Sequence, residues 1–162
     1  MDFTVSTMTP EDLPKVMRLE HECFSWPWSE QMFVDELERG FSHIFLARDG
    51  EGGLVGFICF WVLFDEVHIL NIAVRKALRR RGIGKGLVVG AMKYAKKHGG
   101  KAATLEVREK NSAAIAFYES FGFRRAGLRK NYYDSPPDNA VIMWLYDISE
   151  AVKISEAVKK SP

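Results

Sequence analysis

Three apolar runs rich in β-branched residues follow one another in the first half of the chain, and they constrain the fold more than any other feature. The runs are His43–Arg48, Leu54–Leu63 and Val67–Val74. Asp49-Gly50-Glu51-Gly52-Gly53 separates the first two runs, and Asp65-Glu66 separates the last two. Connections this short join neighbouring antiparallel strands. The pattern therefore predicts an antiparallel three-stranded meander, against which the remaining elements must pack.

Helical and strand patterns lie on both sides of this meander. Thr9 and Pro10 supply a cap and a first-turn proline for a helix that we expect to run to about Glu22, and Ser29 caps a second helix that Gly40 ends. The other expected elements are a strand at Phe3–Met8, a helix that begins near Lys85 and ends at Gly99-Gly100, a strand at Ala103–Val107, a helix from Asn111-Ser112 to Gly122, and strands near Arg124–Arg129 and Ala140–Tyr146. This order predicts an α+β fold with a mixed sheet covered by helices, and not a doubly wound one.

Length and charge exclude several classes of protein. The 162 residues fit one domain, which we expect at residues 1–148, followed by a charged tail at 149–162. The 23 basic and 21 acidic residues are spread along the chain, so we expect no direct nucleic-acid partner. No signal sequence or membrane-length apolar stretch is found, and a cytoplasmic protein without a membrane partner is expected. Cys23 and Cys59 lack metal-ligand spacing, which favours buried free thiols over a disulfide or a zinc site.

A basic turn that contains two glycines, Arg79-Arg80-Arg81-Gly82-Ile83-Gly84-Lys85, leads from the third strand of the meander into a helix. Glycines let the backbone approach a ligand closely, and the amides at the start of a helix attract anions. The turn suits a diphosphate, although an ordinary turn with solvated arginines would carry the same residues. The Walker spacing and the acidic partner of a Rossmann motif are absent, which disfavours nucleotide hydrolysis and dinucleotide binding.

Further motifs follow in register with this turn. They are Asn71-Ile72-Ala73-Val74, Leu105-Glu106-Val107-Arg108, Asn111, Ala114-Ile115-Ala116-Phe117-Tyr118-Glu119 and Gly122-Phe123. With the turn, this array resembles the GNAT acetyltransferase superfamily. With Trp26-Pro27-Trp28-Ser29 and Arg129-Lys130-Asn131-Tyr132-Tyr133, it is similar to the RimI type, the ribosomal-protein-alanine N-acetyltransferases. The likeness extends to about Tyr146 and implies an α/β/α-layered fold whose mostly antiparallel sheet contains a splayed strand pair.

The resemblance also implies a cofactor, acetyl-CoA as the acetyl donor, and no metal. The backbone of Ile72, Ala73 and Val74 would pair with the pantetheine amides as an added strand would. Asn111 would offer its side-chain amide to the cofactor, and a simple helix cap is the alternative for this residue. The residues that the resemblance assigns to the diphosphate are Arg80, Arg81, Gly82, Ile83, Gly84 and Lys85.

The same resemblance assigns Glu106 as the base and Tyr118 as the acid. Acetyl transfer needs two such groups, because a protonated amine cannot attack a thioester and the departing thiolate benefits from a proton. A free glutamate has a pKa of about 4.3 against about 8 for an α-amine, so we expect Glu106 to need burial or a relaying water molecule. The alternatives are a solvated strand carboxylate for Glu106 and a tyrosine packed in the core for Tyr118.

Two aromatic pairs are candidates for binding the substrate. Trp26 and Trp28 lie in one expected loop and Tyr132 and Tyr133 in another, and together they would form walls for the first residues of a peptide. Ordinary loop packing is the alternative. The activity implied is acetylation of an amino-terminal alanine of a small ribosomal-subunit protein, by a monomer or weak dimer. The alternatives are acetylation of a small-molecule amine and a CoA-binding protein without catalysis, which would need neither Glu106 nor Tyr118.

Overall fold

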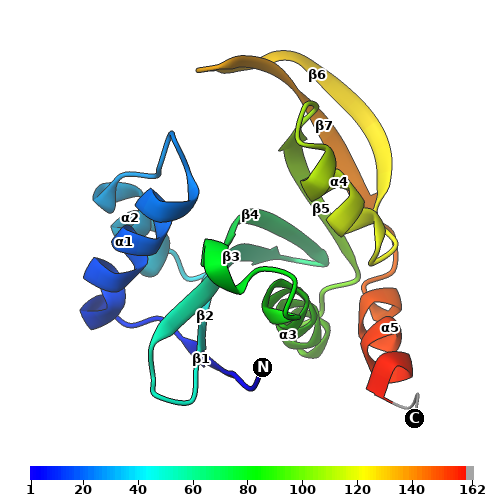
Figure 1. The fold of residues 1–162 in the computed structure, drawn as a ribbon. Helices are drawn as coiled ribbons and strands as arrows, with labels where there is room; N and C mark the ends of the chain where they lie inside the picture. Colours follow the sequence, from blue (N-terminus) through cyan, green and yellow to red (C-terminus); the bar gives the residue numbers. More distant parts are fainter. Residues whose placement is uncertain (160–162) are drawn as a thin grey trace. The chain divides into compact units, whose positions relative to one another are not determined.

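The computed structural model describes residues 1–159 (Figure 1). Seven strands hydrogen-bond in the order β1-β2-β3-β4-β5-β7-β6, with β4 parallel to β5. This arrangement confirms the expected mixed, mostly antiparallel sheet with helices. The elements are β1 Thr4–Thr7, η1 Pro10–Asp12, α1 Leu13–Cys23, α2 Glu30–Glu38, β2 Ser42–Arg48, β3 Leu54–Leu63, β4 Glu66–Val74, η2 Lys76–Leu78, α3 Ile83–Lys97, β5 Ala102–Arg108, α4 Ser112–Glu119, β6 Arg124–Asp134, β7 Pro137–Leu145 and α5 Ser149–Lys159.

The chain forms two compact units. The first consists of Met1–Val62 and Ile69–Ala91, and the second of Leu63–His68 and the chain from Met92 onward. Strand β4 and helix α3 each pass from one unit to the other. The parallel ladder of β4 with β5 lies in the second unit and pairs Glu66–His68 with Ala102–Thr104. The predicted splaying of these strands beyond that ladder stays a prediction.

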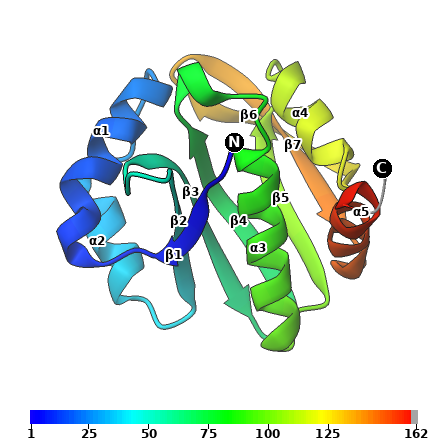
Figure 2. The same ribbon diagram turned by 60° about the horizontal axis from the view of Figure 1, so that its bottom comes forward.

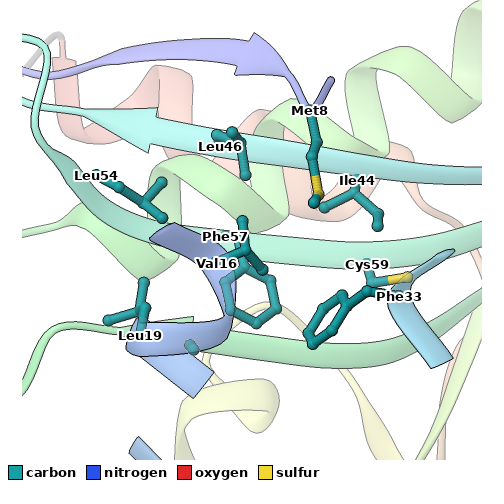
Figure 3. Packing of buried hydrophobic residues seen from close by; sticks show 10 residues of the cluster. Met8, Val16, Leu19, Phe33, Ile44, Leu46, Leu54, Phe57 and Cys59 are labelled. Atoms are coloured by element: carbon teal, nitrogen blue, oxygen red, sulfur yellow. The ribbon is translucent and has the colours of Figure 1, made fainter. Parts of the chain in front are cut away.

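The core of the first unit fills the space between helices α1 and α2 and one face of the meander. Phe33 of α2 and Phe57 of β3 are fully buried, and their rings meet edge to face at 5.6 Å (Figure 3). Val16 and Leu19 of α1 and Ile44 of β2 belong to the same cluster. Burying one such side chain contributes about 1.5–3 kcal/mol. The apolar stripe of α1 therefore fixes this helix to the strands.

Helix α3 packs on the opposite face of the meander. Successive strand residues point to opposite faces, so Gly56 faces away from the side where Phe57 is buried. A Cβ built at Gly56 would lie 3.2 Å from side-chain atoms of both Ile83 and Leu87 of α3. Figure 2 shows α1 and α2 on the side of β2 and β3 away from α3. The absence of a side chain at Gly56 thus allows the start of α3 to approach β3.

In the second unit, β5 and β6 both pair antiparallel with β7. Strands β6 and β7 form a long, curved hairpin (Figure 1). Within the expected charged tail, α5 begins at Ser149, and Ala151 is fully buried. A Cβ at Gly122 would lie 2.6 Å from a carboxylate oxygen of Glu150, so α5 packs close to the chain that follows α4. The last three residues of that tail, 160–162, lie outside the described residues.

Two predicted boundaries are wrong, for identifiable reasons. The first helix begins as a 3-10 turn, and α1 proper begins at Leu13, because Pro14 has no N–H for an α-helical bond to the carbonyl of Pro10. The connection expected between the strands near Arg124–Arg129 and Ala140–Tyr146 is much shorter than predicted, since β6 extends to Asp134 and β7 begins at Pro137. Proline is tolerated at the first position of a strand, so Pro137 does not end the ladder.

Candidate active-site residues

The basic turn after β4 presents a helix N-terminus. Gly82 precedes α3, and its carbonyl accepts the first helical bond, from the N–H of Gly86 at 2.9 Å. The N–H groups of Ile83, Gly84 and Lys85 therefore have no partner within the helix. Arg80 and Gly82 both adopt positive φ angles, 62° and 84°, which bends the chain sharply ahead of these amides. The exposed arginines of the turn and these backbone amides together make a site suited to an anion.

Some backbone groups at the end of β4, which is predicted to pair with pantetheine, already make hydrogen bonds within the protein. The carbonyl of Val74 accepts from Nε of Arg79 at 3.1 Å and from the thiol of Cys23 at 3.4 Å. The N–H of Arg75 donates to the carbonyl of Val55 at 2.9 Å. These bonds fix the direction in which the chain leaves β4 for the basic turn.

The two tryptophans of the α1–α2 loop have different environments. The ring of Trp28 packs on the core cluster of the first unit and lies 5.2 Å from the ring of Phe33. Trp26 is 65% exposed. Loop packing, the alternative interpretation, therefore describes Trp28, whereas the ring of Trp26 is available to a ligand.

A buried carboxylate that the sequence pattern did not single out lies behind this loop. Glu20 of α1 is 1% exposed, and it accepts hydrogen bonds from the backbone of Trp28 and the side chain of Asn71 in β4. Burial raises the pKa of Glu20, and the two hydrogen bonds oppose that rise. The one sequence signal for Glu20 is its spacing, because it follows Val16 by four residues and therefore lies on the same face of α1.

In the second unit, Glu106 of β5 lies between two groups of β6. Oε2 accepts from the hydroxyl of Tyr132 at 3.0 Å, and Oε1 is 3.3 Å from Nε of Arg129. The side chain of Glu106 keeps 35% of its surface exposed, so the predicted base is partly solvated and not deeply buried. The hydrogen bond to Glu106 and partial burial raise the pKa of Tyr132. Both oxygens of the predicted base are thus engaged in this arrangement.

Tyr118 of α4, the predicted acid, is only 7% exposed. Its ring packs edge to face against Phe117 and Phe123, at 5.2 Å and 5.6 Å. Burial, with a smaller effect from the neighbouring Tyr133, raises the pKa of the Tyr118 phenol. The phenol therefore keeps its proton at neutral pH, as a proton donor must and as a core tyrosine also does.

The tip of the β6–β7 hairpin is held by Arg108 of β5. Its guanidinium donates to the carbonyls of Pro136 and Ser135, at 2.8 Å and 3.1 Å, and lies 4.1 Å from the centre of the Tyr133 ring. Burial of the half-buried Tyr133 raises the pKa of its phenol. Tyr132 and Tyr133 belong to strand β6 and not to the loop that the sequence predicted.

Asn111 caps α4, as the local alternative for this residue proposed. Its Oδ1 accepts from the N–H of Ala114 at 3.1 Å. Capping uses only the amide oxygen, and the NH2 group of the same side chain is the part that can donate to a cofactor.

The predicted site residues fall into two groups. The turn residues Arg80 to Lys85, the end of β4 and the two tryptophans belong to the first unit. The remaining predicted residues, Glu106, Asn111, Tyr118, Tyr132 and Tyr133, belong to the second. Within the second unit the structure brings Glu106 together with Tyr132. The convergence of tryptophans and tyrosines on one peptide groove stays a prediction.

Two features are absent from residues 1–159. This part of the chain has no group of three or more His, Cys, Asp or Glu side chains that could hold a metal ion. It also has no helix that is both long and apolar enough to cross a membrane.

Comparison with known proteins places these elements in a family. The family model of the GNAT acetyltransferases matches residues 13–123. The chain is 35% identical over 144 residues to the ribosomal protein bS18-alanine N-acetyltransferase of Escherichia coli K12, which covers 88% of this chain and 96% of that relative. The protein of the same name from Salmonella typhimurium has the same identity and coverage.

A solved structure gives the same assignment. The crystal structure of the ribosomal-protein-S18-alanine N-acetyltransferase from Escherichia coli matches with a TM-score of 0.82 and 34% identity. The match covers 89% of this chain and 93% of the other. Sequence identity, family model and fold give the same assignment. The chain therefore belongs to the GNAT acetyltransferase family and is an N-acetyltransferase.

Proposed function

We propose that this enzyme transfers the acetyl group of acetyl-CoA to the free α-amino group of a protein, and that its substrate begins with alanine and belongs to the small ribosomal subunit. The observation that carries this proposal is the identity of 35% over 88% of the chain with bacterial enzymes named for alanine acetylation of ribosomal protein bS18. A peptide amino terminus also suits the chemistry. An α-amine has a pKa of about 8 against about 10.4 for lysine, so more of it is unprotonated near neutral pH.

In this proposal, residues of the first unit bind the diphosphate and the pantetheine arm of the cofactor, and Asn111 of the second unit adds one contact. The amides of Ile83, Gly84 and Lys85 and the exposed Arg80 and Arg81 receive the diphosphate. The support is the sharp turn at Gly82, which leaves the helix amides without partners within α3. The edge of β4 pairs with the pantetheine arm, and the NH2 group of Asn111 donates to the cofactor.

Proton transfer is assigned to Glu106 and Tyr118. Glu106 takes a proton from the incoming ammonium group, directly or through water, and the amine then attacks the thioester carbon. The tetrahedral intermediate expels the CoA thiolate, which receives the phenolic proton of Tyr118. The nitrogen, now part of the amide, releases its extra proton to water, and the Tyr118 phenolate regains a proton from the solvent. The incoming ammonium must compete with Tyr132 and Arg129 for the carboxylate of Glu106. Because Tyr132 and Arg129 hold the carboxylate from two sides, the orientation of Glu106 is fixed before the amine binds.

A peptide panel tests the proposal. The purified enzyme is incubated with acetyl-CoA and with three acceptors: a peptide with a free amino-terminal alanine, the same peptide with a blocked amino terminus and a free lysine, and a polyamine. Mass spectrometry is expected to show one added acetyl group, on the alanine peptide. Acetylation of the lysine or the polyamine alone would contradict the proposal. Calorimetric binding of CoA without transfer to any acceptor would favour a binding protein instead.

A further inference from the structure

Glu20 is a carboxylate at a buried position, where apolar side chains are the rule. It lies on the inward face of α1, whose neighbours Val16 and Leu19 belong to the core cluster. Burying a carboxylate costs free energy that an apolar side chain of similar volume would avoid. A buried carboxylate is tolerated when strong hydrogen bonds compensate it, so its partners indicate what it does.

Each oxygen of Glu20 bonds to a different segment of the first unit. Oε1 accepts from the backbone N–H of Trp28 at 2.9 Å, and Oε2 accepts from the side-chain NH2 of Asn71 at 3.0 Å. Trp28 lies in the loop between α1 and α2, and Asn71 lies in β4, three residues before Val74. Hydrogen bonds to an ionised acceptor are shorter and stronger than neutral ones. The carboxylate therefore joins the loop to the strand that carries the proposed pantetheine edge.

This junction determines where the exposed tryptophan of the loop is held. The backbone of Trp28 is bonded to Glu20, and its ring is packed on the core beside Phe33. Trp26 lies two residues earlier, with only Pro27 between the two tryptophans, and its ring is mostly in solvent. Proline restricts its own φ angle and the conformation of the residue before it. Fixing Trp28 thus restricts the position of the Trp26 ring.

We propose that Glu20 is a positioning residue for the peptide substrate: through Trp28 and Asn71 it fixes the α1–α2 loop on β4, so that Trp26 is preorganised as a wall for the first residues of the peptide. This inference rests on the proposed function, since it takes the exposed face of the loop as a peptide-binding surface. Preorganisation lowers the cost of ordering the loop when the ligand binds. The carboxylate itself takes no part in proton transfer.

Three variants test the proposal by steady-state kinetics with the alanine peptide. Glu20→Leu keeps the volume but leaves the N–H of Trp28 and the amide of Asn71 without an acceptor. We expect it to raise KM for the peptide on the order of tenfold, with KM for acetyl-CoA unchanged. Glu20→Gln can accept from Trp28 and, after the amide of Asn71 rotates, donate to its oxygen, so it should restore most of the affinity for the peptide.

The matched control is Glu36→Leu. Glu36 of α2 is also buried, at 6% exposure, and its carboxylate accepts from Nε1 of Trp61 at 2.7 Å and from Arg39. It does not bond to the α1–α2 loop, so its loss should reduce stability and leave KM for the peptide unchanged. Equal effects of Glu20→Leu and Glu36→Leu on KM, or a Glu20→Gln variant as impaired as Glu20→Leu, would overturn the proposal.

A second measurement does not depend on the substrate. Hydrogen exchange followed by mass spectrometry reports on the backbone amides of residues 24–29. Exchange at these residues should rise in Glu20→Leu and not in Glu36→Leu, because only the former removes the acceptor of the Trp28 N–H. Unchanged exchange at residues 24–29 in Glu20→Leu would overturn the positioning role of Glu20, whichever acceptor the enzyme acetylates. Failure of the wild-type enzyme on the alanine peptide would instead contradict the proposed function.

Discussion

The same substitution at two glycines next to or within α3 should have opposite effects on stability. Gly82, just before the helix, has a φ of 84°, whereas Gly90 lies inside the helix and has no positive φ. A Cβ built at either position meets no atom within 4 Å. Steric clash with the surroundings is thereby removed from the comparison, and only the backbone conformation distinguishes Gly82→Ala from Gly90→Ala.

The expected magnitudes follow from this difference. An alanine held in the left-handed region costs about 1–2 kcal/mol, whereas an alanine that replaces a helical glycine gains roughly 0.5–1 kcal/mol. For a chain of this length, 1 kcal/mol corresponds to a change in Tm of about 2–4 °C. Gly82→Ala should therefore lower Tm by about 2–8 °C, and Gly90→Ala should raise it by about 1–4 °C.

Differential scanning calorimetry of the two variants and the wild type measures these shifts in Tm. Calorimetric titration measures the affinity of each protein for CoA, which depends on the conformation of the turn. If the turn relaxes to accommodate the methyl group that Gly82→Ala introduces, the strain disappears, and CoA binding should then weaken by up to about thirtyfold, the equivalent of 2 kcal/mol. A Gly82→Ala variant with both the Tm and the CoA affinity of the wild type would refute the reasoning. A decrease in Tm for Gly90→Ala would show that the helix does not tolerate a side chain there.

Four further outcomes are expected. Tyr118→Phe should lower kcat by about 100-fold or more and leave calorimetric CoA affinity unchanged, and an unchanged kcat would remove the proposed acid. Tyr132→Phe, which deletes one donor to Glu106, should lower kcat/KM less than Glu106→Gln does, and the reverse order in the same peptide assay would contradict the proposed base. Gly56→Ala places a Cβ 2.9 Å from a backbone carbonyl oxygen of β4 and should lower the free energy of unfolding in urea by about 1–3 kcal/mol, whereas a wild-type urea midpoint would mean that the strand moves at no cost. Burial raises the pKa of Cys59 to about 12, so iodoacetamide at a pH of about 8.5, near the pKa of a free thiol, should label this residue only after unfolding; rapid labelling of native protein would contradict its burial.

Local signals in the sequence predicted the starts of α2 and α4. Ser29 and Asn111 were both expected as caps, and each side-chain oxygen accepts from the backbone N–H three residues later. Such bonds depend only on residues within one turn, so the sequence alone is sufficient to identify them. The three strands of the meander agree with their predicted bounds to within one residue for the same reason, since short turns delimit them.

Contacts between distant residues could not be predicted in this way. The periodicity of α1 shows that Glu20 faces inward, but its partner Asn71 lies 51 residues further along the chain. Likewise, spacing gives no indication that Tyr132 bonds to Glu106, 26 residues away. The extent of β6 was underestimated because pairing with β7 decides it. A register shift between Arg129 and Tyr133 allows the pairing to continue almost to the turn.

The unequal burial of Trp26 and Trp28 has a consequence for how this enzyme can diversify. The ring of Trp28 packs on the core of the first unit, whereas the exposed ring of Trp26 contributes little to stability. Substitutions at exposed positions usually change the free energy of unfolding by no more than about 0.5 kcal/mol. Position 26 can therefore vary while the scaffold beneath it stays intact. Selection, natural or in the laboratory, can sample new side chains there without first compensating for a weakened fold.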